Sequence, residues 1–264
     1  MITSTKNPKI KRIRVLQSSN RARNVEKVFI VEGDRLVGEA LQADWDARAV
    51  FYTDDISHRG KAALEELAER GVATEQVSPH VMRAASDTQT PQGILVEFSI
   101  KDLHLPSKLD FVLILDAVRD PGNLGTILRT AAASGVQAVL LPPGSVDIYS
   151  PKVLRGGMGA HFRLPISSLG WREIEDITQK SGLHVILAEA GSGQVYTQMD
   201  YRSPLVIIIG GEAHGAGPQA QTMAETAVHI PMPGGTESLN AAVATGVVLF
   251  EVVRQRRSTD LPSA

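Results

Sequence analysis

Short apolar segments alternate with segments of helical periodicity along the first hundred residues. VFIVEG at residues 28–33 is typical of a strand followed by a turn, and the apolar positions between Leu36 and Leu41 repeat at the spacing of one helix face. The same alternation predicts strands at 48–53, 72–77 and 93–98 and helices at 60–70 and 79–85. We therefore expect a small α/β domain over residues 1–98.

A second alternating pattern follows a polar segment. Residues 99–109 contain Pro106 and show no sustained periodicity, so they are predicted to be a linker. FVLILD at 111–116 is a continuous apolar run, typical of a strand buried on both faces of a parallel sheet. Further strands are expected near 137–141, 183–188, 204–210 and 227–230, and helices near 123–134, 150–158, 171–181, 217–223 and 238–256. Residues 110–264 are thus predicted to form an α/β domain with a mainly parallel sheet, whose binding loops follow the carboxyl ends of the strands.

The composition fits a folded chain of two domains. Of the 264 residues, 43% are apolar and 21% are charged, which argues against a mainly disordered or fibrous chain. The absence of cysteine excludes a disulfide scaffold, thiol catalysis and thiolate metal ligands. The opening residues lack the apolar core of a signal peptide, and no apolar run is long enough to span a bilayer, so we expect a cytoplasmic protein.

The net charge of −2 conceals a strongly basic N-terminal segment. Residues 1–27 hold eight Lys and Arg residues against Glu26, a local charge of +7. Such a segment is equally compatible with the solvated face of a helix and with a surface that binds the phosphates of RNA. The eight cations are Lys6, Lys9, Lys11, Arg12, Arg14, Arg21, Arg23 and Lys27.

The loop after the apolar run at 111–116 reads AVRDPGN and leads into a helical segment. Its Pro-Gly pair is expected to form a tight turn, with Asn123 as the cap of the helix. Arg129 shares a helix face with Gly125 and Ala132, which are too small to shield it. Because helical side chains lean toward the N-terminus, the Arg129 guanidinium can reach back toward Asn123. A Rossmann GxGxxG sequence is missing at this point of the chain.

A second loop, GGEAHGAG at 210–217, follows another fully apolar strand. Its glycines leave the backbone open to a ligand beside the lone carboxylate of Glu212. Taken alone, the same composition fits a flexible surface turn better than a site.

A third loop, IPMPGGTESLN at 230–240, enters the last helical segment. Ser238 or Asn240 is expected to cap that helix. The loop also offers an apolar pocket with polar edges, formed by Ile230, Met232 and Leu239. The helix itself is apolar on nearly every side from Ala241 to Val253, more than one packing partner requires, so a homodimer is expected.

Three segments in this order carry a family resemblance. DAVRDPGNLGTILRTA, IGGEAHGAG and IPMPGGTESLNAAVATGVVLFE resemble the three motifs of the SpoU/TrmH group of SPOUT RNA ribose 2'-O-methyltransferases, over residues 111–256. KNPKIKRIRVLQ and FIVEGDRLVGEAL are similar to the L30e-like RNA-binding domain that many of these enzymes carry. The chain departs from the family pattern at Ala216 and Gly217, where a larger apolar residue and a serine are common, and at Gly157, where serine is frequent.

The resemblance implies a C-terminal α/β domain tied in a trefoil knot and the transfer of a methyl group from S-adenosylmethionine to a ribose 2'-hydroxyl. It implies a cofactor pocket formed by Gly210, Glu212, Ile230, Met232, Ser238 and Leu239. It implies a catalytic set of Arg129, Asn123, Glu212, Ser238 and Asn240. The family credits the residue at Arg129 with removing the hydroxyl proton, but a guanidinium normally stays protonated, so Arg129 is equally suited to clamp a phosphate and stabilise charge. No metal is required, and the histidines are scattered singly.

The resemblance favours ribosomal RNA, most of all 23S rRNA, as the partner, because the segment YSPKVLRGGMGAHFRLPI is familiar from ribosomal members. The residues expected to contact RNA are Lys6, Lys9, Lys11, Arg21, Arg23 and Arg155. Two alternatives stay open at this point: a tRNA 2'-O-methyltransferase, and an inactive RNA-binding protein of the ribosome. The presence of all five catalytic candidates argues against the inactive protein.

Overall fold

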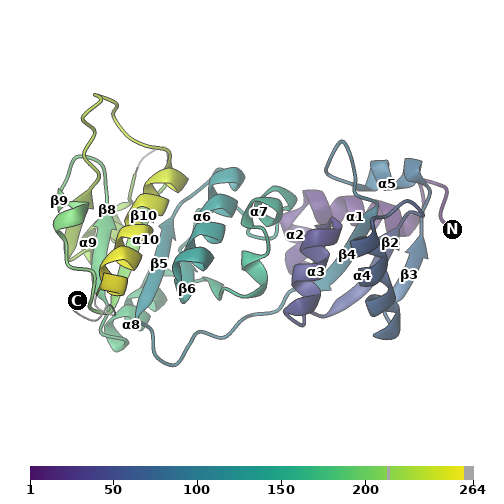
Figure 1. The fold of residues 1–264 in the computed structure, drawn as a ribbon, viewed down its shortest axis with the longest axis horizontal. Coiled ribbons are helices and arrows are strands. Elements are labelled where there is room, and N and C mark those ends of the chain that lie inside the picture. Colours follow the sequence, from purple (N-terminus) through teal and green to yellow (C-terminus); the bar gives the residue numbers. More distant parts are fainter. Residues whose placement is uncertain (213–214, 259–264) are drawn as a thin grey trace. The chain divides into compact units, whose positions relative to one another are not determined.

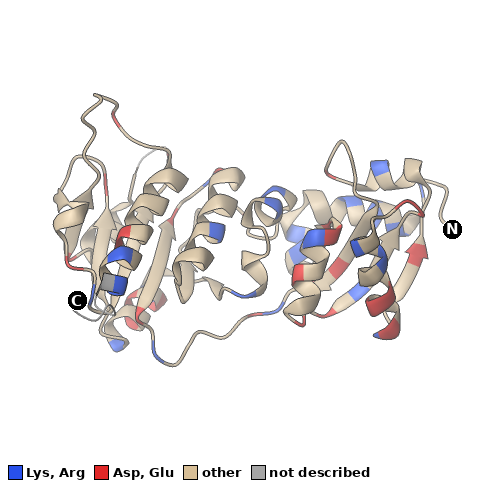
Figure 2. Cartoon of the chain, viewed as in Figure 1, with Lys and Arg blue, Asp and Glu red and all other residues tan. Residues whose placement is uncertain are grey.

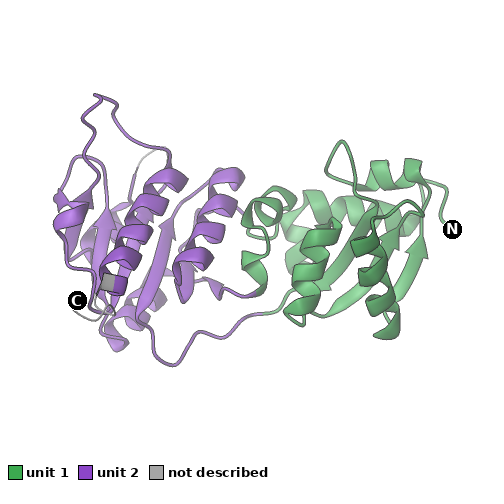
Figure 3. Ribbon diagram, in the orientation of Figure 1, with its two compact units in different colours: residues 1–101, 147–162 green, residues 102–146, 163–264 purple. Residues whose placement is uncertain are grey.

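The computed structural model describes residues 1–212 and 215–258 and divides into two compact units, shown in green and purple in Figure 3. The first unit contains residues 1–101 and 147–162, and the second contains the rest of the described chain. Ala213 and His214 of the second loop lie outside the described residues.

A four-stranded sheet in the order β1-β4-β2-β3 forms the centre of the first unit (Figure 1). Strand β4 is antiparallel to β1 and β2, whereas β3 is parallel to β2. The strands are β1 (Val28–Glu32), β2 (Ala47–Tyr52), β3 (Ala73–Gln76) and β4 (Ile94–Ser99). These bounds confirm the four strands predicted from the apolar pattern.

The basic N-terminal segment folds as two helices that the apolar pattern did not predict. Helix α1 (Pro8–Ser18) begins at the cap Asn7, whose side chain accepts a hydrogen bond from the Lys9 amide (2.9 Å), and it buries Ile10, Ile13 and Leu16 on one face. The other helices of this unit are α2 (Asn20–Glu26), α3 (Asp34–Gln42), α4 (His58–Glu69) and α5 (Pro79–Ala85). Apolar residues of α1 and α5 pack with β1, β2 and β4 in one core cluster.

Residues 147–162, which lie within the predicted second domain along the sequence, pack with the first unit. They contain α7 (Pro151–Gly157) and the short 3-10 helix η1 (Ala160–Phe162). The Trp45 indole donates a hydrogen bond to the Phe162 carbonyl (3.1 Å), and the two rings meet edge to face. Tyr149 stacks on Phe29, with ring centroids 4.6 Å apart. Aromatic burial therefore holds this segment against β1 and against Trp45, which lies between α3 and β2 of the first unit.

A seven-stranded, fully parallel sheet in the order β7-β6-β5-β10-β8-β11-β9 forms the second unit. The strands are β5 (Phe111–Asp116), β6 (Ala138–Leu141), β7 (Ile166–Ser168), β8 (His184–Ala188), β9 (Gln194–Val195), β10 (Leu205–Gly210) and β11 (Thr226–His229). The helices are α6 (Pro121–Ser134), α8 (Trp171–Lys180), η2 (Tyr196–Gln198), α9 (Pro218–Met223) and α10 (Ala241–Ser258). The predicted α/β class with a mainly parallel sheet is confirmed.

Helices cover both faces of this sheet. Val112, Ile114 and Ile208 project to one face and share a core cluster with Ile174 of α8 and Ala220 of α9. Because side chains alternate along a strand, the intervening residues face the opposite layer, where α6 and α10 lie side by side (Figure 1). Strand β5 is buried over its whole length and β10 as far as Ile209, as the apolar runs predicted.

Two helix starts differ from the sequence prediction. Helix α6 begins at Pro121, and its cap is Asp120, whose side chain accepts a hydrogen bond from the Asn123 amide (2.8 Å). Proline is well suited to the first helical position because no partner is needed for the missing N–H. The predicted Pro-Gly turn is therefore the first turn of the helix, and Asn123 keeps its side chain for other partners. Helix α10 begins at Ala241, after the predicted start at residue 238.

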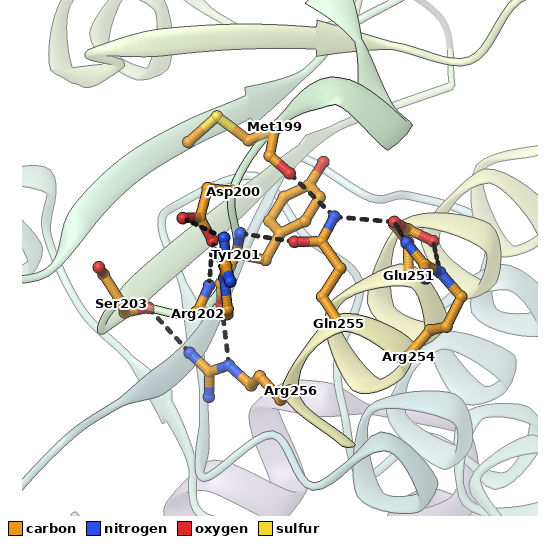
Figure 4. Close-up of polar contacts among 9 residues, drawn as sticks. All are labelled: Met199, Asp200, Tyr201, Arg202, Ser203, Glu251, Arg254, Gln255 and Arg256. Carbon is orange, nitrogen blue, oxygen red and sulfur yellow. Dashed lines mark hydrogen bonds and ion pairs between the residues drawn. The ribbon is translucent and has the colours of Figure 1, made fainter. Parts of the chain in front are cut away.

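The C-terminal end of α10 is fixed by a polar network (Figure 4). Gln255 donates to the Met199 carbonyl (2.9 Å) and accepts from the Tyr201 amide (3.1 Å). Arg256 donates to the carbonyls of Tyr201 (2.9 Å) and Ser203 (3.0 Å). These bonds hold the helix to the segment that precedes β10. Within the described chain, no helix is both long and apolar enough to cross a membrane.

Candidate active site

Strand register places the first two loops side by side. Strands β5 and β10 are parallel neighbours, with Asp116 opposite Gly210, so the segments that follow both strands leave the same edge of the sheet. The buried Asp116 carboxylate accepts a hydrogen bond from the Gly217 amide (2.7 Å). This bond closes the 210–217 loop back onto the end of β5.

Two glycines allow this close approach. A Cβ atom at Gly211 would lie 2.3 Å from the Ala117 carbonyl oxygen, and a Cβ atom at Gly210 would lie 2.3 Å from the Ala216 amide nitrogen. Both neighbours are backbone atoms that cannot move away without opening the loop. Gly211 is therefore required by the contact between the two loops and Gly210 by the closure of its own loop, which decides against the alternative of an unconstrained surface turn.

A chain of hydrogen bonds joins one side chain from each of the three predicted loops. Asn123 Nδ2 donates to Glu212 Oε1 (2.8 Å), and Asn123 Oδ1 accepts from Asn240 Nδ2 (2.9 Å). Asn240 Oδ1 accepts in turn from the amides of Ala242 (2.9 Å) and Val243 (3.3 Å), and so caps α10. The structure thus brings together three predicted catalytic residues that are distant in the sequence.

Glu212 is held in its ionised form. Partial burial by itself raises the pKa of the Glu212 carboxyl, but the hydrogen bonds from Asn123 and from the backbone amides of Glu212, Arg119 and Asp120 outweigh burial and lower the pKa below its ordinary value. The carboxylate therefore acts as an acceptor that orients Asn123 and the 117–120 segment.

A cavity of about 720 Å³ opens beside this network. Its volume lies in the range of sites for ligands of nucleotide size. Every predicted cofactor residue lines it, namely Gly210, Glu212, Ile230, Met232, Ser238 and Leu239. Asn123 and Asn240 line it as well, and Ile209 and Val248 add apolar surface. The cavity therefore combines apolar walls with a polar edge along the three loops.

Sequence reasoning missed Glu189, which follows β8 and lines the same cavity. Its Oε2 accepts a hydrogen bond from Ser192 Oγ (2.9 Å). Its Oε1 faces Gly215, since a Cβ atom at that glycine would lie 3.9 Å from it. A carboxylate directly after an apolar strand, in the sequence HVILAEAG, was the available signal.

Arg129 does not line the cavity as the structure describes it. Its side chain is exposed on α6, and it forms no hydrogen bond or ion pair with the residues that the structure describes. Gly125 is buried and Ala132 is exposed, so the small-residue surroundings of Arg129 lie partly on the outer face of the helix. The guanidinium is thus available to an external partner.

The predicted RNA-binding residues differ in burial and in ion pairing. Arg23 is buried, with Nε 2.7 Å from Asp147 Oδ2 and further bonds to the carbonyls of Leu16 and Gln17, so its predicted role as a phosphate contact is corrected to a structural one. Lys9 pairs with Glu75 and Arg155 with Asp87 (2.7 Å). Lys6, Lys11 and Arg21 are exposed. Figure 2 shows basic positions along several helices of this unit, with acidic positions among them.

The described residues contain no group of three His, Asp or Glu side chains arranged to hold a metal ion. The arrangement instead is that of an α/β enzyme whose glycine loops close on a cavity suited to a nucleotide-like cofactor. The sequence profile of the SpoU rRNA methylase family matches residues 110–250, and that of the MRM3-like substrate binding domain matches residues 7–96. The chain therefore belongs to the SpoU rRNA methylase family, and it is an enzyme.

Characterised relatives match nearly the whole chain. The 23S rRNA (guanosine(2553)-2'-O)-methyltransferase RlmP of Bacillus subtilis is 31% identical over 95% of this chain and 98% of its own length. The mitochondrial rRNA methyltransferase 3 of Homo sapiens is 30% identical, over 93% of this chain and 72% of its own. The AdoMet-bound rRNA methyltransferase from Sinorhizobium meliloti superimposes with a TM-score of 0.87, at 30% identity, over 99% of this chain and 98% of that chain.

Proposed function

We propose that this protein transfers the methyl group of S-adenosylmethionine to a ribose 2'-hydroxyl of 23S ribosomal RNA. The observation that carries the proposal is the Glu212–Asn123–Asn240 network at the edge of the 720 Å³ cavity. The kinship with RlmP, which bears this activity in its name, supports the RNA and the reaction. A cytoplasmic location is part of the proposal, because the relative RlmP, which matches this chain over 98% of its own length, is a bacterial protein.

The cavity fits the cofactor. Ile230, Met232 and Leu239 provide apolar surface for an adenine ring, and the glycine loop at 210–211 provides backbone groups for its polar edge. Glu189 presents a carboxylate that suits hydroxyl or ammonium donors of the cofactor. When bound, the cofactor supplies an electrophilic methyl group next to a sulfonium charge.

The three-loop network positions the reaction. Asn123 fixes the start of α6, Asn240 fixes the start of α10, and Glu212 joins both to the 210–217 loop. An in-line displacement depends strongly on the orientation of the attacking oxygen, so rigid loops contribute directly to the rate. Ser238, exposed on the cavity wall, is placed to contact the nucleotide or the cofactor.

Arg129 is proposed to stabilise the attacking 2'-oxygen and an adjacent phosphate. A guanidinium remains protonated at neutral pH, so electrostatic stabilisation is a better role for it than proton abstraction. As the oxygen–methyl bond forms and the methyl–sulfur bond breaks, the 2'-hydroxyl proton passes to solvent and S-adenosylhomocysteine is the leaving group. Its exposure and its freedom from partners among the described residues leave all of its donors for RNA.

A homodimer is part of the proposal. Val243 and Phe250 on the outer face of α10 are 53% and 49% exposed, whereas Ala242, Val248 and Val252 on the inner face are buried. Large apolar side chains exposed two turns apart on one face of a helix are typical of an interface. Helix α6, which carries Arg129, packs beside α10, so a second copy bound there would border Arg129.

A trefoil knot is also proposed for the second unit. Strand β11 lies beyond β8 in the sheet, yet the following helix α10 packs on α6, which follows β5. Residues 230–240 must therefore carry the chain back past β8 and β10. Knots are rare in proteins in general. This return of the chain across the sheet nevertheless supports the trefoil knot that the SPOUT resemblance implies.

The proposal is tested with in vitro-transcribed 23S rRNA and S-adenosylmethionine labelled in the methyl group. We expect label in the RNA and one 2'-O-methylated ribose that resists alkaline cleavage, with little label in a tRNA transcript. Methylation of the tRNA in preference to the 23S rRNA would contradict the proposed substrate.

Arg129→Ala should lower the methylation rate by about a hundredfold, because one electrostatic stabiliser of the transition state is removed. Cofactor affinity, measured by calorimetry, should be unchanged. Arg172→Ala, which removes an exposed arginine of α8, is the matched control and should keep its rate. A normal rate in Arg129→Ala would refute the role of Arg129.

A further inference from the structure

The fold neutralises much of the basic N-terminal segment. Arg12 donates to both carboxylate oxygens of Glu97 (2.5 and 2.9 Å) and to Glu26 (2.7 Å). Lys9 pairs with Glu75, and Arg23 is buried against Asp147. The surface that residues 1–27 present to a polyanion in the folded protein is therefore less positive than the +7 charge of the sequence. The cations that remain without such partners show where an anion can bind.

One face of α1 keeps its positive charge. Lys11, Arg14, Val15 and Ser18 follow the spacing i, i+3, i+4 and i+7, and all four are exposed. Neither Lys11 nor Arg14 forms a side-chain hydrogen bond or ion pair within the described chain. Burying Ile10 and Ile13 on the opposite face fixes this orientation of the helix.

This face forms one wall of a groove of about 610 Å³, and residues 84–87, at the end of α5, form the other. We refer to it as the α1–α5 groove. The Ser86 hydroxyl on its wall is buried and has no hydrogen-bond partner. The Asp87 carboxylate also lines the groove, but it is bound to Arg155 (2.7 Å). A buried hydroxyl without a partner is costly, and a ligand oxygen in the groove would satisfy it.

We propose that the α1–α5 groove binds the phosphodiester backbone of the RNA substrate. Lys11 and Arg14, one turn apart, contact phosphate oxygens, and the Ser86 hydroxyl donates to a phosphate or ribose oxygen. The groove therefore contributes affinity and orientation, while the nucleotide is selected elsewhere. This assignment rests on the proposed function. It reduces the six RNA contacts predicted from the sequence to two basic residues, Lys11 and Arg14. Arg14 was not among the six.

The test uses the full chain and compares two charge reversals. Lys11→Glu/Arg14→Glu alters the groove, and Arg59→Glu/Lys61→Glu makes the same change of charge at exposed positions of α4. Binding of in vitro-transcribed 23S rRNA is measured by filter retention over a range of salt concentrations. Circular dichroism and cofactor calorimetry establish that both variants are folded.

The groove variant should bind the RNA about thirtyfold more weakly at 0.15 M salt, because each released counterion is worth roughly fivefold there, and its salt slope should fall by about two. The α4 variant should lose little affinity and keep its slope. Equal losses of RNA affinity in both variants would show a general effect of charge and would contradict RNA binding in the groove. Unchanged binding in the groove variant would overturn it as well.

Ser86→Ala separates ligand binding from a structural role. Because the hydroxyl has no partner in the fold, its removal should leave the melting temperature unchanged or raised while weakening RNA binding a fewfold, with the same salt slope. A lowered melting temperature with normal RNA binding would assign Ser86 to the fold. Methylation by the wild-type chain is measured on the same RNA: if methylation fails while the groove variant binds more weakly, the proposed function is wrong and the groove stands.

Discussion

Asn123 can occupy its position only as an amide. Its nitrogen donates to Glu212 while its oxygen accepts from Asn240, so a carboxylate would lose the first bond and a hydrophobic side chain would lose both. The lowered pKa of Glu212 follows from the same arrangement, since the ionised carboxylate receives the donors. Asn123 thus helps to keep Glu212 ionised and fixes the position of Asn240.

Glu189→Gln should weaken S-adenosylmethionine binding about tenfold, because a charged acceptor on the cavity wall is replaced by a neutral one. Isothermal calorimetry measures the change. Ser192→Ala is the control, since Ser192 only donates to Glu189 Oε2, and it should have a smaller effect. Equal affinity in Glu189→Gln and the wild type would remove Glu189 from the cofactor site.

The sequence was able to single out polar residues whose local surroundings are unusual, although their catalytic roles stay predictions. Asn123, Glu212 and Asn240 stand out as single polar side chains in glycine-bearing loops, and the structure brings them together. The Arg23–Asp147 pair joins residues 124 positions apart, and no local pattern indicates it. The charge of the basic segment left a solvated helix face and an RNA-binding surface equally open, and the family resemblance then placed Arg23 among the RNA contacts, because its burial is not visible in the sequence.

At the level of elements, residues 147–162 pack in the first unit although the residues before and after them in the sequence belong to the second. The chain passes from β6 into this segment and returns to β7, while the segment's aromatic side chains are buried in the first unit. Tyr149 and Phe162 lie on either side of α7, outside the helix itself, so the apolar pattern predicted α7 correctly but gave no information about the packing partner of the segment.

The same segment should make stability depend on pH. Burial lowers the pKa of His161 to about 4, and the nearby Asp147 charge only partly opposes this. Because the pKa in the folded state lies below the unfolded value near 6.5, the stabilising contribution is complete above pH 6.5 and is lost as the pH falls toward 4. The full loss is roughly 3 kcal/mol.

Thermal melts between pH 4 and pH 7 check this dependence. His161→Gln should show a flatter curve of melting temperature against pH than the wild type, whatever its stability at pH 7. Parallel curves for the two proteins would contradict the contribution of His161.

Elements with a long apolar run could be predicted from the sequence, whereas very short strands and a helix rich in charged residues could not. The runs at 111–116 and 204–210 became buried strands because every residue contributes to a two-sided core. β9 has two residues and β7 has three, too few for any periodic signal. Helix α1 was not predicted because its three buried apolar residues stand among many charged ones, so the helical periodicity is weak. These residues are Ile10, Ile13 and Leu16.

For the whole molecule, the exposed face of α10 predicts a dimer. Phe250→Asp should give a monomer at micromolar concentration, because a charge in an apolar interface cannot be solvated there. Light scattering measures the mass. Val25→Asp, at an apolar residue of α2 that is 75% exposed, is the control and should remain dimeric. A wild-type protein of monomeric mass would contradict the dimer.

The division of the chain also affects how the two units can be studied. Deleting residues 1–98 would remove the strands and helices on which Tyr149 and Phe162 pack, and would leave these aromatic side chains without a core. Point substitutions in the intact chain are therefore the better way to examine RNA binding.

Helix α10 connects two distant places in the second unit. Asn240 caps it at the cavity, and Gln255 ties its other end to Met199 and Tyr201, a helical distance of about 22 Å away. Hydrogen bonds at both ends fix the position of the helix, and with it the position of Asn240 at the cavity. Loss of the Gln255 bonds is therefore expected to displace Asn240, so changes made to this pocket need to preserve the distant end of the helix as well.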